Sequence, residues 1–115
     1  MSRALDLNAI EQPTLDITMR DNDRTVFHLS VPSVEFVEKM QALEPVLAKM
    51  KKGDNAVESV KQVFGFFAQV FSHNEDGIKV TAEELRDKYR LNLLHLFAIY
   101  NQYEGFIEDI KNAKN

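Results

Sequence analysis

The fold is decided by residues 33–53, which read SVEFVEKMQALEPVLAKMKKG. Apolar side chains recur here at alternating four- and three-residue steps, which places them on one stripe of a helix. The stripe consists of Phe36, Met40, Leu43, Leu47 and Met50. Ser33 can cap the first turn, and Gly53 favours an end to the helix. We therefore expect a helix over 33–52 that packs this stripe into a core.

Pro45 interrupts the same segment. Proline has no backbone N–H and crowds the preceding turn, so it removes one hydrogen bond from a helix interior. The sequence therefore predicts a kink or a break near residues 42–44 instead of one straight helix.

Three further helical segments follow in the sequence. Residues 55–72 carry one apolar stripe, made of Val57, Val60, Phe64, Phe67 and Phe71, and Asp54 or Asn55 can cap them. Thr81 and Glu84 have the spacing of a capping box, which predicts a helix over 82–90. Residues 91–112 are the most apolar segment, and we expect that helix to be buried on more than one side.

The N-terminal third has a different pattern. Residues 1–13 lack sustained periodicity and are expected to form a flexible arm. Residues 14–31 read as a β-hairpin, with alternating apolar side chains before a turn at 21–24 and β-forming residues after it. A lone hairpin is marginal in water, so it should lie on a helix or pair with another chain, leaving an edge available. The predicted fold is mainly α with this hairpin (α+β), a single domain over 14–115 with a bundle of about four helices.

Composition excludes several classes of protein. The chain has 115 residues, 44% of them apolar, with no cysteine and a net charge of -4. Disulfides and cysteine-ligated zinc are impossible, and no extended basic footprint for nucleic acid is present. The lysines of 49–52 precede a predicted helix end, where cations complement the helix dipole. No signal peptide or apolar span is evident, so we expect an intracellular chain without membrane contact.

The closest approach to a metal site is the segment 72–83. Asn74, Asp76, Gly77 and Glu83 fall at positions three, five, six and twelve of an EF-hand loop. The first position is Ser72 instead of Asp, and Lys79 occupies the usually aliphatic eighth position. The segment is therefore interpreted as a degenerate calcium loop or, alternatively, as an acidic helix connection with Gly77 in a positive-φ turn.

The usual signatures of catalysis are missing. His28, His73 and His95 lack metal-ligand spacing, and the chain has no nucleophile elbow and no glycine-rich phosphate loop. The segment 91–103 is too apolar to serve as a DNA-recognition helix. We therefore expect no enzyme activity, no cofactor, no metal and no nucleic-acid partner.

Two stretches carry a resemblance to a known family. They are TLDITMRDNDRTVFHLSVPSVEFVEKMQ (14–41) and GIKVTAEELRDKYRLNLLHLFAIYNQYEGFIEDI (77–110). In style and element order they resemble the tail assembly chaperones of long-tailed bacteriophages. The resemblance implies an oligomeric protein of the host bacterial cytoplasm, absent from the mature virion, that coats the tape measure protein and recruits tail tube protein.

Four aromatic residues are candidates for partner contact. They are Phe66, displaced from the centre of its stripe, and Tyr100, Tyr103 and Phe106 of the last helix. The alternative for each is a place in the core. The alternative function is a small regulatory or adaptor protein, which could use segment 72–83 as a calcium-responsive loop.

Overall fold

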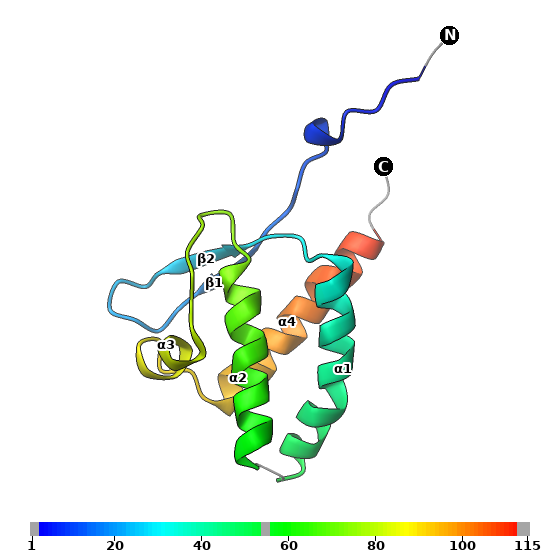
Figure 1. The fold of residues 1–115 in the computed structure, drawn as a ribbon. Helices are drawn as coiled ribbons and strands as arrows, with labels where there is room; N and C mark the ends of the chain where they lie inside the picture. Colours follow the sequence, from blue (N-terminus) through cyan, green and yellow to red (C-terminus); the bar gives the residue numbers. More distant parts are fainter. Residues whose placement is uncertain (1–2, 54–55, 113–115) are drawn as a thin grey trace.

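A computed structural model describes residues 3–53 and 56–112 of the chain (Figure 1). The described residues form four α-helices, one antiparallel hairpin and one short 3-10 helix. In chain order the elements are η1 (Leu7–Ala9), β1 (Leu15–Thr18), β2 (Val26–Leu29), α1 (Val34–Lys51), α2 (Val57–Ser72), α3 (Ala82–Asp87) and α4 (Leu93–Lys111). The predicted fold class is confirmed: the chain is mainly helical with a small hairpin near its N-terminus.

The hairpin turns where the sequence predicts it. A carboxylate oxygen of Asp21 accepts the Thr25 amide at 2.8 Å, and its other oxygen accepts the Thr25 hydroxyl. Arg24 takes a left-handed conformation with φ of 50°, which reverses the chain. The two strands then pair over four residues each.

The hairpin lies on α2. Phe27 of β2 is fully buried and meets the rings of Phe71 and Tyr89 edge-on, at centroid distances of 5.4 and 5.7 Å. This edge-to-face geometry suits aromatic quadrupoles and adds to the energy of burial. The structure therefore confirms that a helix supports the hairpin.

One edge of the hairpin is covered by a later segment. The amide of Ser30, directly after β2, donates to the His73 carbonyl at 3.0 Å. The Glu75 amide donates to the carbonyl of His28, within β2, also at 3.0 Å. Among the described residues, the outer edge of β1 has no strand partner. The available edge is therefore that of β1.

The helix that is buried on several sides is α2, not α4. Seven of the nine residues of α2 from Val63 to Phe71 are buried, because the hairpin, α1 and α3 all pack around this helix. By contrast, α4 buries a single stripe, made of Leu96, Ile99, Tyr100, Tyr103, Phe106 and Ile107. The expectation of multi-sided burial for 91–112 was wrong, because composition does not reveal which helix lies at the centre.

Of the two outcomes predicted at Pro45, a kink or a break, the break is absent. α1 continues from Val34 to Lys51 with Pro45 inside it and with Ser33 as the cap. Pro45 leaves the Gln41 carbonyl without its amide donor, and both residues lie on the exposed side of the helix. The buried residues on both sides of Pro45 lie on one stripe, and this packing favours a continuous helix.

The boundary between the last two helices also differs from the prediction. α3 ends at Asp87 and α4 begins at Leu93, so the predicted helices 82–90 and 91–112 are each too long there. Arg90 has a φ of 54°, and its side chain donates to the Arg20 carbonyl while Arg20 donates to the Arg90 carbonyl. This reciprocal pair ties the connection to the hairpin.

The start of α2 lies slightly later than predicted. The helix begins at Val57 with Ala56 at the capping position and no side-chain cap, instead of beginning at residue 55. The proposed caps Asp54 and Asn55 lie outside the described residues. The capping box of Thr81 and Glu84 at the start of α3 is confirmed.

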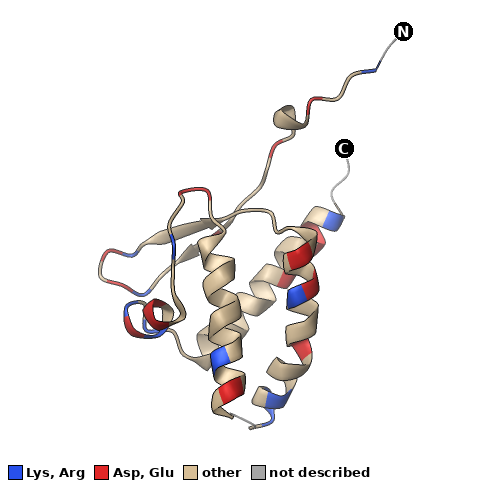
Figure 2. Ribbon diagram, viewed as in Figure 1, with Lys and Arg blue, Asp and Glu red and all other residues tan. Residues whose placement is uncertain are grey.

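Charged residues are interspersed over the helices and the hairpin (Figure 2). As expected, Lys49 and Lys51 lie in the last turn of α1, which Gly53 closes with a positive φ. Cations at this end of a helix meet the partial negative charge of its free carbonyls. No helix in the described part of the chain combines the length and apolarity needed to cross a bilayer.

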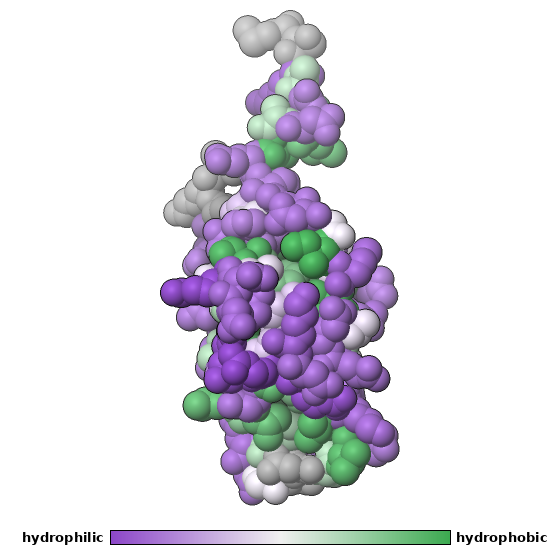
Figure 3. Space-filling view, turned by 90° about the vertical axis from the view of Figure 1, so that its left-hand side faces the viewer, coloured by the Kyte–Doolittle hydropathy of each residue, from purple (hydrophilic) through white to green (hydrophobic). Residues whose placement is uncertain are grey.

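The N-terminal segment stands clear of the body as an arm (Figure 3). Every described residue of the arm, from residue 3 to residue 13, is exposed. The arm contains one turn of 3-10 helix, η1, where the sequence predicted no element, and Asp6 caps this turn by accepting the Asn8 amide. Leu5, Leu7 and Ile10 are therefore held on a segment without a core of its own.

Candidate partner-binding site

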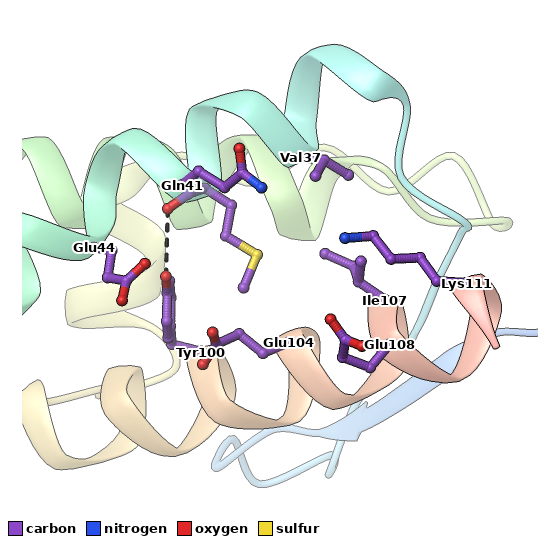
Figure 4. Close-up of a pocket in the computed structure, with 9 residues that line it drawn as sticks. Val37, Gln41, Glu44, Tyr100, Glu104, Ile107, Glu108 and Lys111 are labelled. Atoms are coloured by element: carbon purple, nitrogen blue, oxygen red, sulfur yellow. Dashed lines mark hydrogen bonds between the residues drawn. The ribbon is translucent and has the colours of Figure 1, made fainter.

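A groove runs between α1 and α4, and Figure 4 shows side chains that line one part of it. The groove contains two hollows, of about 150 and 180 Å³. Their apolar side chains are Val37, Met40 and Ile107 in the first hollow and Leu47, Ala48 and Phe97 in the second. Three residues border both hollows, namely Glu44, Tyr100 and Glu104. The groove thus has a mixed apolar and polar lining, with a polar centre that the two hollows share.

Tyr100 occupies that centre. Its hydroxyl donates to the Met40 carbonyl at 3.4 Å (Figure 4). Burial raises the pKa of Tyr100 to about 12, and the carboxylates of Glu104 and Glu44 act in the same direction. The phenol therefore stays protonated at neutral pH, and the charge at the centre comes from the two carboxylates.

A second concave surface lies at the root of the arm. Its volume is about 560 Å³, and it is bordered by the arm, by Val31 and by the C-terminal half of α4. The apolar residues around it are Ile10, Pro13, Val31, Phe106 and Ile110. This surface connects the exposed arm to the body of the molecule.

The four aromatic residues proposed from the sequence do not form one surface. Phe66 borders a hollow between α1 and α2, Tyr100 borders the α1–α4 groove, and Phe106 borders the surface at the arm root. Tyr103 borders none of these hollows and is 1% exposed. All four are buried, so only the parts that face a hollow are accessible, and their contact with a partner stays a prediction.

The residues that the sequence reasoning missed are of two kinds. The first are the carboxylates that line the groove, Glu44, Glu104 and Glu108. The second are the apolar residues of the arm, of which Leu5 is 77%, Leu7 69% and Ile10 45% exposed. The first set could have been found as acidic positions that flank the apolar stripes of α1 and α4. The second set lies in a segment where apolar residues have no periodic partners.

Side chains of the segment 72–83 form hydrogen bonds with backbone amides of the same segment. The side-chain oxygen of Asn74 accepts the Asp76 and Ile78 amides at 3.0 Å, and the Ser72 hydroxyl accepts the Val80 amide at 2.9 Å. Gly77 has the positive φ expected of a turn, 71°. Within the described ranges, no group of three or more His, Cys, Asp or Glu residues is placed to hold a metal ion. These contacts favour the interpretation as an acidic helix connection.

The three histidines lie in separate environments. His28 contacts Asp16 through its Nδ1 at 2.7 Å, and this contact raises the pKa of His28 and lowers that of Asp16. His73 packs against an aromatic ring of α1. The Nδ1 of His95 accepts the Asn92 amide at 3.0 Å, and burial lowers the pKa of His95. Each imidazole therefore has a local structural role of its own.

Comparison of the chain with protein-family models, with curated proteins and with solved structures found no match.

Proposed function

We propose that this chain is a non-catalytic assembly chaperone of the phage-tail type. It binds the tape measure protein, keeps this long helical client soluble and promotes assembly of the tail tube protein around it. It acts in the cytoplasm of the host bacterium and is absent from the mature virion. The resemblance of residues 14–41 and 77–110 to tail assembly chaperones suggests the client, and the arm supports a protein-binding role.

The observation that carries the proposal is the exposure of the arm's apolar residues. Leu5 and Leu7 are held in water on a segment that stands off the body, and Ile10, which is 45% exposed, borders the concave surface at the root of that segment. Fully burying a side chain of this kind contributes about 1.5–3 kcal/mol. Three large apolar side chains exposed within six residues of chain favour an interaction surface, since a monomer gains nothing from keeping them exposed.

The same proposal includes self-association of the chaperone. The outer edge of β1 is free of strand partners within the described residues, and an extended segment from another chain can add to such an edge. Several copies bound along one client would bring these edges together. Homo-oligomer formation on the client is therefore part of the proposed function.

Co-expression with the tape measure protein tests the proposal. The expected result is a soluble complex with several copies of this chain per client, measured by size exclusion with light scattering. The triple variant L5S/L7S/I10S should lower the yield of soluble client. The matched control is V57S/L94S, which removes two exposed apolar side chains from α2 and α4, outside the arm.

An insoluble client beside a freely monomeric chain would contradict the proposal. In that case the small regulatory or adaptor protein becomes the better interpretation. A calcium titration then separates the two forms of that alternative, because binding to segment 72–83 would raise the melting temperature.

A further inference from the structure

The two hollows of the α1–α4 groove repeat at an interval of seven residues. On α1, the residues that line the first hollow are Val37, Met40, Gln41 and Glu44, and those that line the second are Glu44, Leu47, Ala48 and Lys51. On α4, the corresponding sets are Glu104, Ile107, Glu108 and Lys111 for the first and Phe97, Tyr100, Asn101 and Glu104 for the second, with Tyr100 also reaching the first. Each position in one set has a counterpart seven residues away in the other, on both helices.

This repeat matches the dimensions of a helix. Seven residues of α-helix rise about 10.5 Å, which is close to two turns. A third helix lying along the groove would therefore present its side chains at i and i+7 to the two hollows. Insertion of side chains into holes formed by neighbouring helices is the packing of helical bundles and coiled coils.

The size of the hollows fits one side chain each. Their volumes are about 150 and 180 Å³. An apolar cavity of the smaller size accommodates a benzene molecule. Each hollow therefore has room for one large apolar side chain, such as Leu or Phe, while the backbone of the bound helix stays outside the groove.

The charged residues around the hollows indicate which charged residues a partner helix would carry. Glu44 and Glu104 lie between the hollows, and Glu108 lies beside the first. The two lysines that line the groove, Lys51 and Lys111, lie at opposite ends of it. A bound helix would place its i+3 and i+4 positions against the acidic centre, where Lys or Arg is favoured and Glu or Asp is disfavoured.

We infer that the α1–α4 groove binds an amphipathic helix of the client with apolar residues at i and i+7 and basic residues at i+3 or i+4. This inference names the client element of the proposed function and rests on it. The partner element is a helix because the hollows repeat at helical spacing, and it is basic because Glu44, Glu104 and Glu108 lie between or beside the hollows.

Binding of a synthetic helix to the full chain tests the inference. The probe is a fluorescein-labelled peptide with Leu at i and i+7 and Lys at i+3 and i+4, followed by fluorescence anisotropy. The double variant E44Q/E104Q should weaken binding by about threefold to tenfold, because each exposed ion pair contributes modestly. The control E58Q/E83Q removes two exposed carboxylates outside the groove and should leave the affinity unchanged. Added salt should weaken binding to the unmodified protein.

A second pair of variants tests the hollow without removing charge. Ala48 is exposed and lines the second hollow, so Ala48→Phe should fill it and reduce peptide binding at least as much as E44Q/E104Q does. Ala98 is exposed on α4 and lies outside both hollows, so Ala98→Phe is the matched control. Circular dichroism checks that both variants keep their helix content.

Three outcomes would overturn the inference: equal binding of a peptide in which Glu replaces both Lys residues, unchanged affinity of E44Q/E104Q, or unchanged affinity of A48F. Failure of the groove and failure of the chaperone function remain distinguishable. If the tape measure protein is solubilised equally well by A48F and E44Q/E104Q, the function stands and the groove assignment is wrong. If the peptide binds as described while the client stays insoluble, the groove stands and the client is wrong.

Discussion

The second half of α2 and the N-terminal arm are both rich in apolar residues, yet their surroundings are opposite. Phe67 and Phe71 of α2 have no exposed surface, whereas Leu5 and Leu7 of the arm expose more than two thirds of theirs. The difference arises because α2 has neighbours on several sides and the arm stands off the body. Apolar character alone therefore does not separate buried residues from exposed ones; the number of packed neighbours does.

The largest effect should follow truncation in the centre of α2. Phe67→Ala removes a fully buried ring and leaves a cavity, so we expect a loss of about 3–5 kcal/mol in the free energy of unfolding. Urea denaturation followed by circular dichroism measures it. Leu7→Ala in the arm is the control and should change stability by less than about 0.5 kcal/mol. Equal effects of the two changes would mean that the arm belongs to the cooperative core.

A smaller loss of stability is expected from a substitution in the connection that follows α2. The Asn74 side chain accepts two backbone amides and donates to the Phe71 and Ile78 carbonyls, both at 2.7 Å. Asn74→Ala leaves three partly buried groups and the exposed Asp76 amide without this partner, and we expect a loss of about 1–3 kcal/mol in the free energy of unfolding. Thermal melts with Asn22→Ala as the exposed control check this. A melting temperature equal to that of the control would show that the side chain does not hold the loop.

Helical periodicity predicted much of this fold. In α1 the alternating steps identified Phe36, Met40, Leu43, Leu47 and Met50; the last four are buried, and Phe36 is partly buried against the core. The predicted ends were less accurate where the ending depends on contacts between distant segments. Arg90 adopts a left-handed conformation that glycine usually takes, and it is held there by contacts with Arg20.

The start of α4 had a signal that the sequence reasoning did not use. Asn92 accepts the His95 amide, and the His95 ring accepts the Asn92 amide, which is a capping box with His in place of Glu or Gln. The general pattern of cap and third residue was present, but the residue types differ from the usual ones. A search for any acceptor side chain at the third position would have found it.

The candidate site was harder to predict than the fold. The aromatic residues chosen from the sequence are buried, because a helix's exposed face depends on which elements surround it. The groove depends on two helices far apart in the chain, whose stripes must face each other with the same seven-residue repeat. Glu44 and Glu104 acquire a common role only through that arrangement.

The hairpin, which follows the arm in the chain, carries an ion pair between His28 and Asp16. Asp16 raises the pKa of His28 above its usual 6.5, and the pair lowers the pKa of Asp16 below its usual 3.8. The His28 contribution to stability is lost as pH rises through the raised pKa, and the Asp16 contribution is lost as pH falls through the lowered one. Both are fully present between pH 3.8 and 6.5.

NMR titration of the histidine rings measures this coupling. Asp16→Asn should lower the pKa of His28 and leave that of His95 unchanged, since burial in α4 sets the latter. In the unmodified protein His28 should titrate at a higher pH than His95. The reverse order, or an unchanged His28 pKa in the variant, would contradict the ion pair.

The smallest expected effect on stability is also the most direct test of the arm. The variant L5S/L7S/I10S removes three apolar side chains that make no part of the buried core, so its free energy of unfolding should change by less than about 0.5 kcal/mol. Its ability to keep a client soluble should nevertheless fall, because the same side chains supply apolar area for contact. The two regions would then affect different properties. F67A would lower the stability on which any binding depends. The arm variant would lower binding while the fold stays intact. If the arm variant lowered the melting temperature by as much as F67A does, the arm would have to pack against the body in solution, and its role as a free binding segment would be lost.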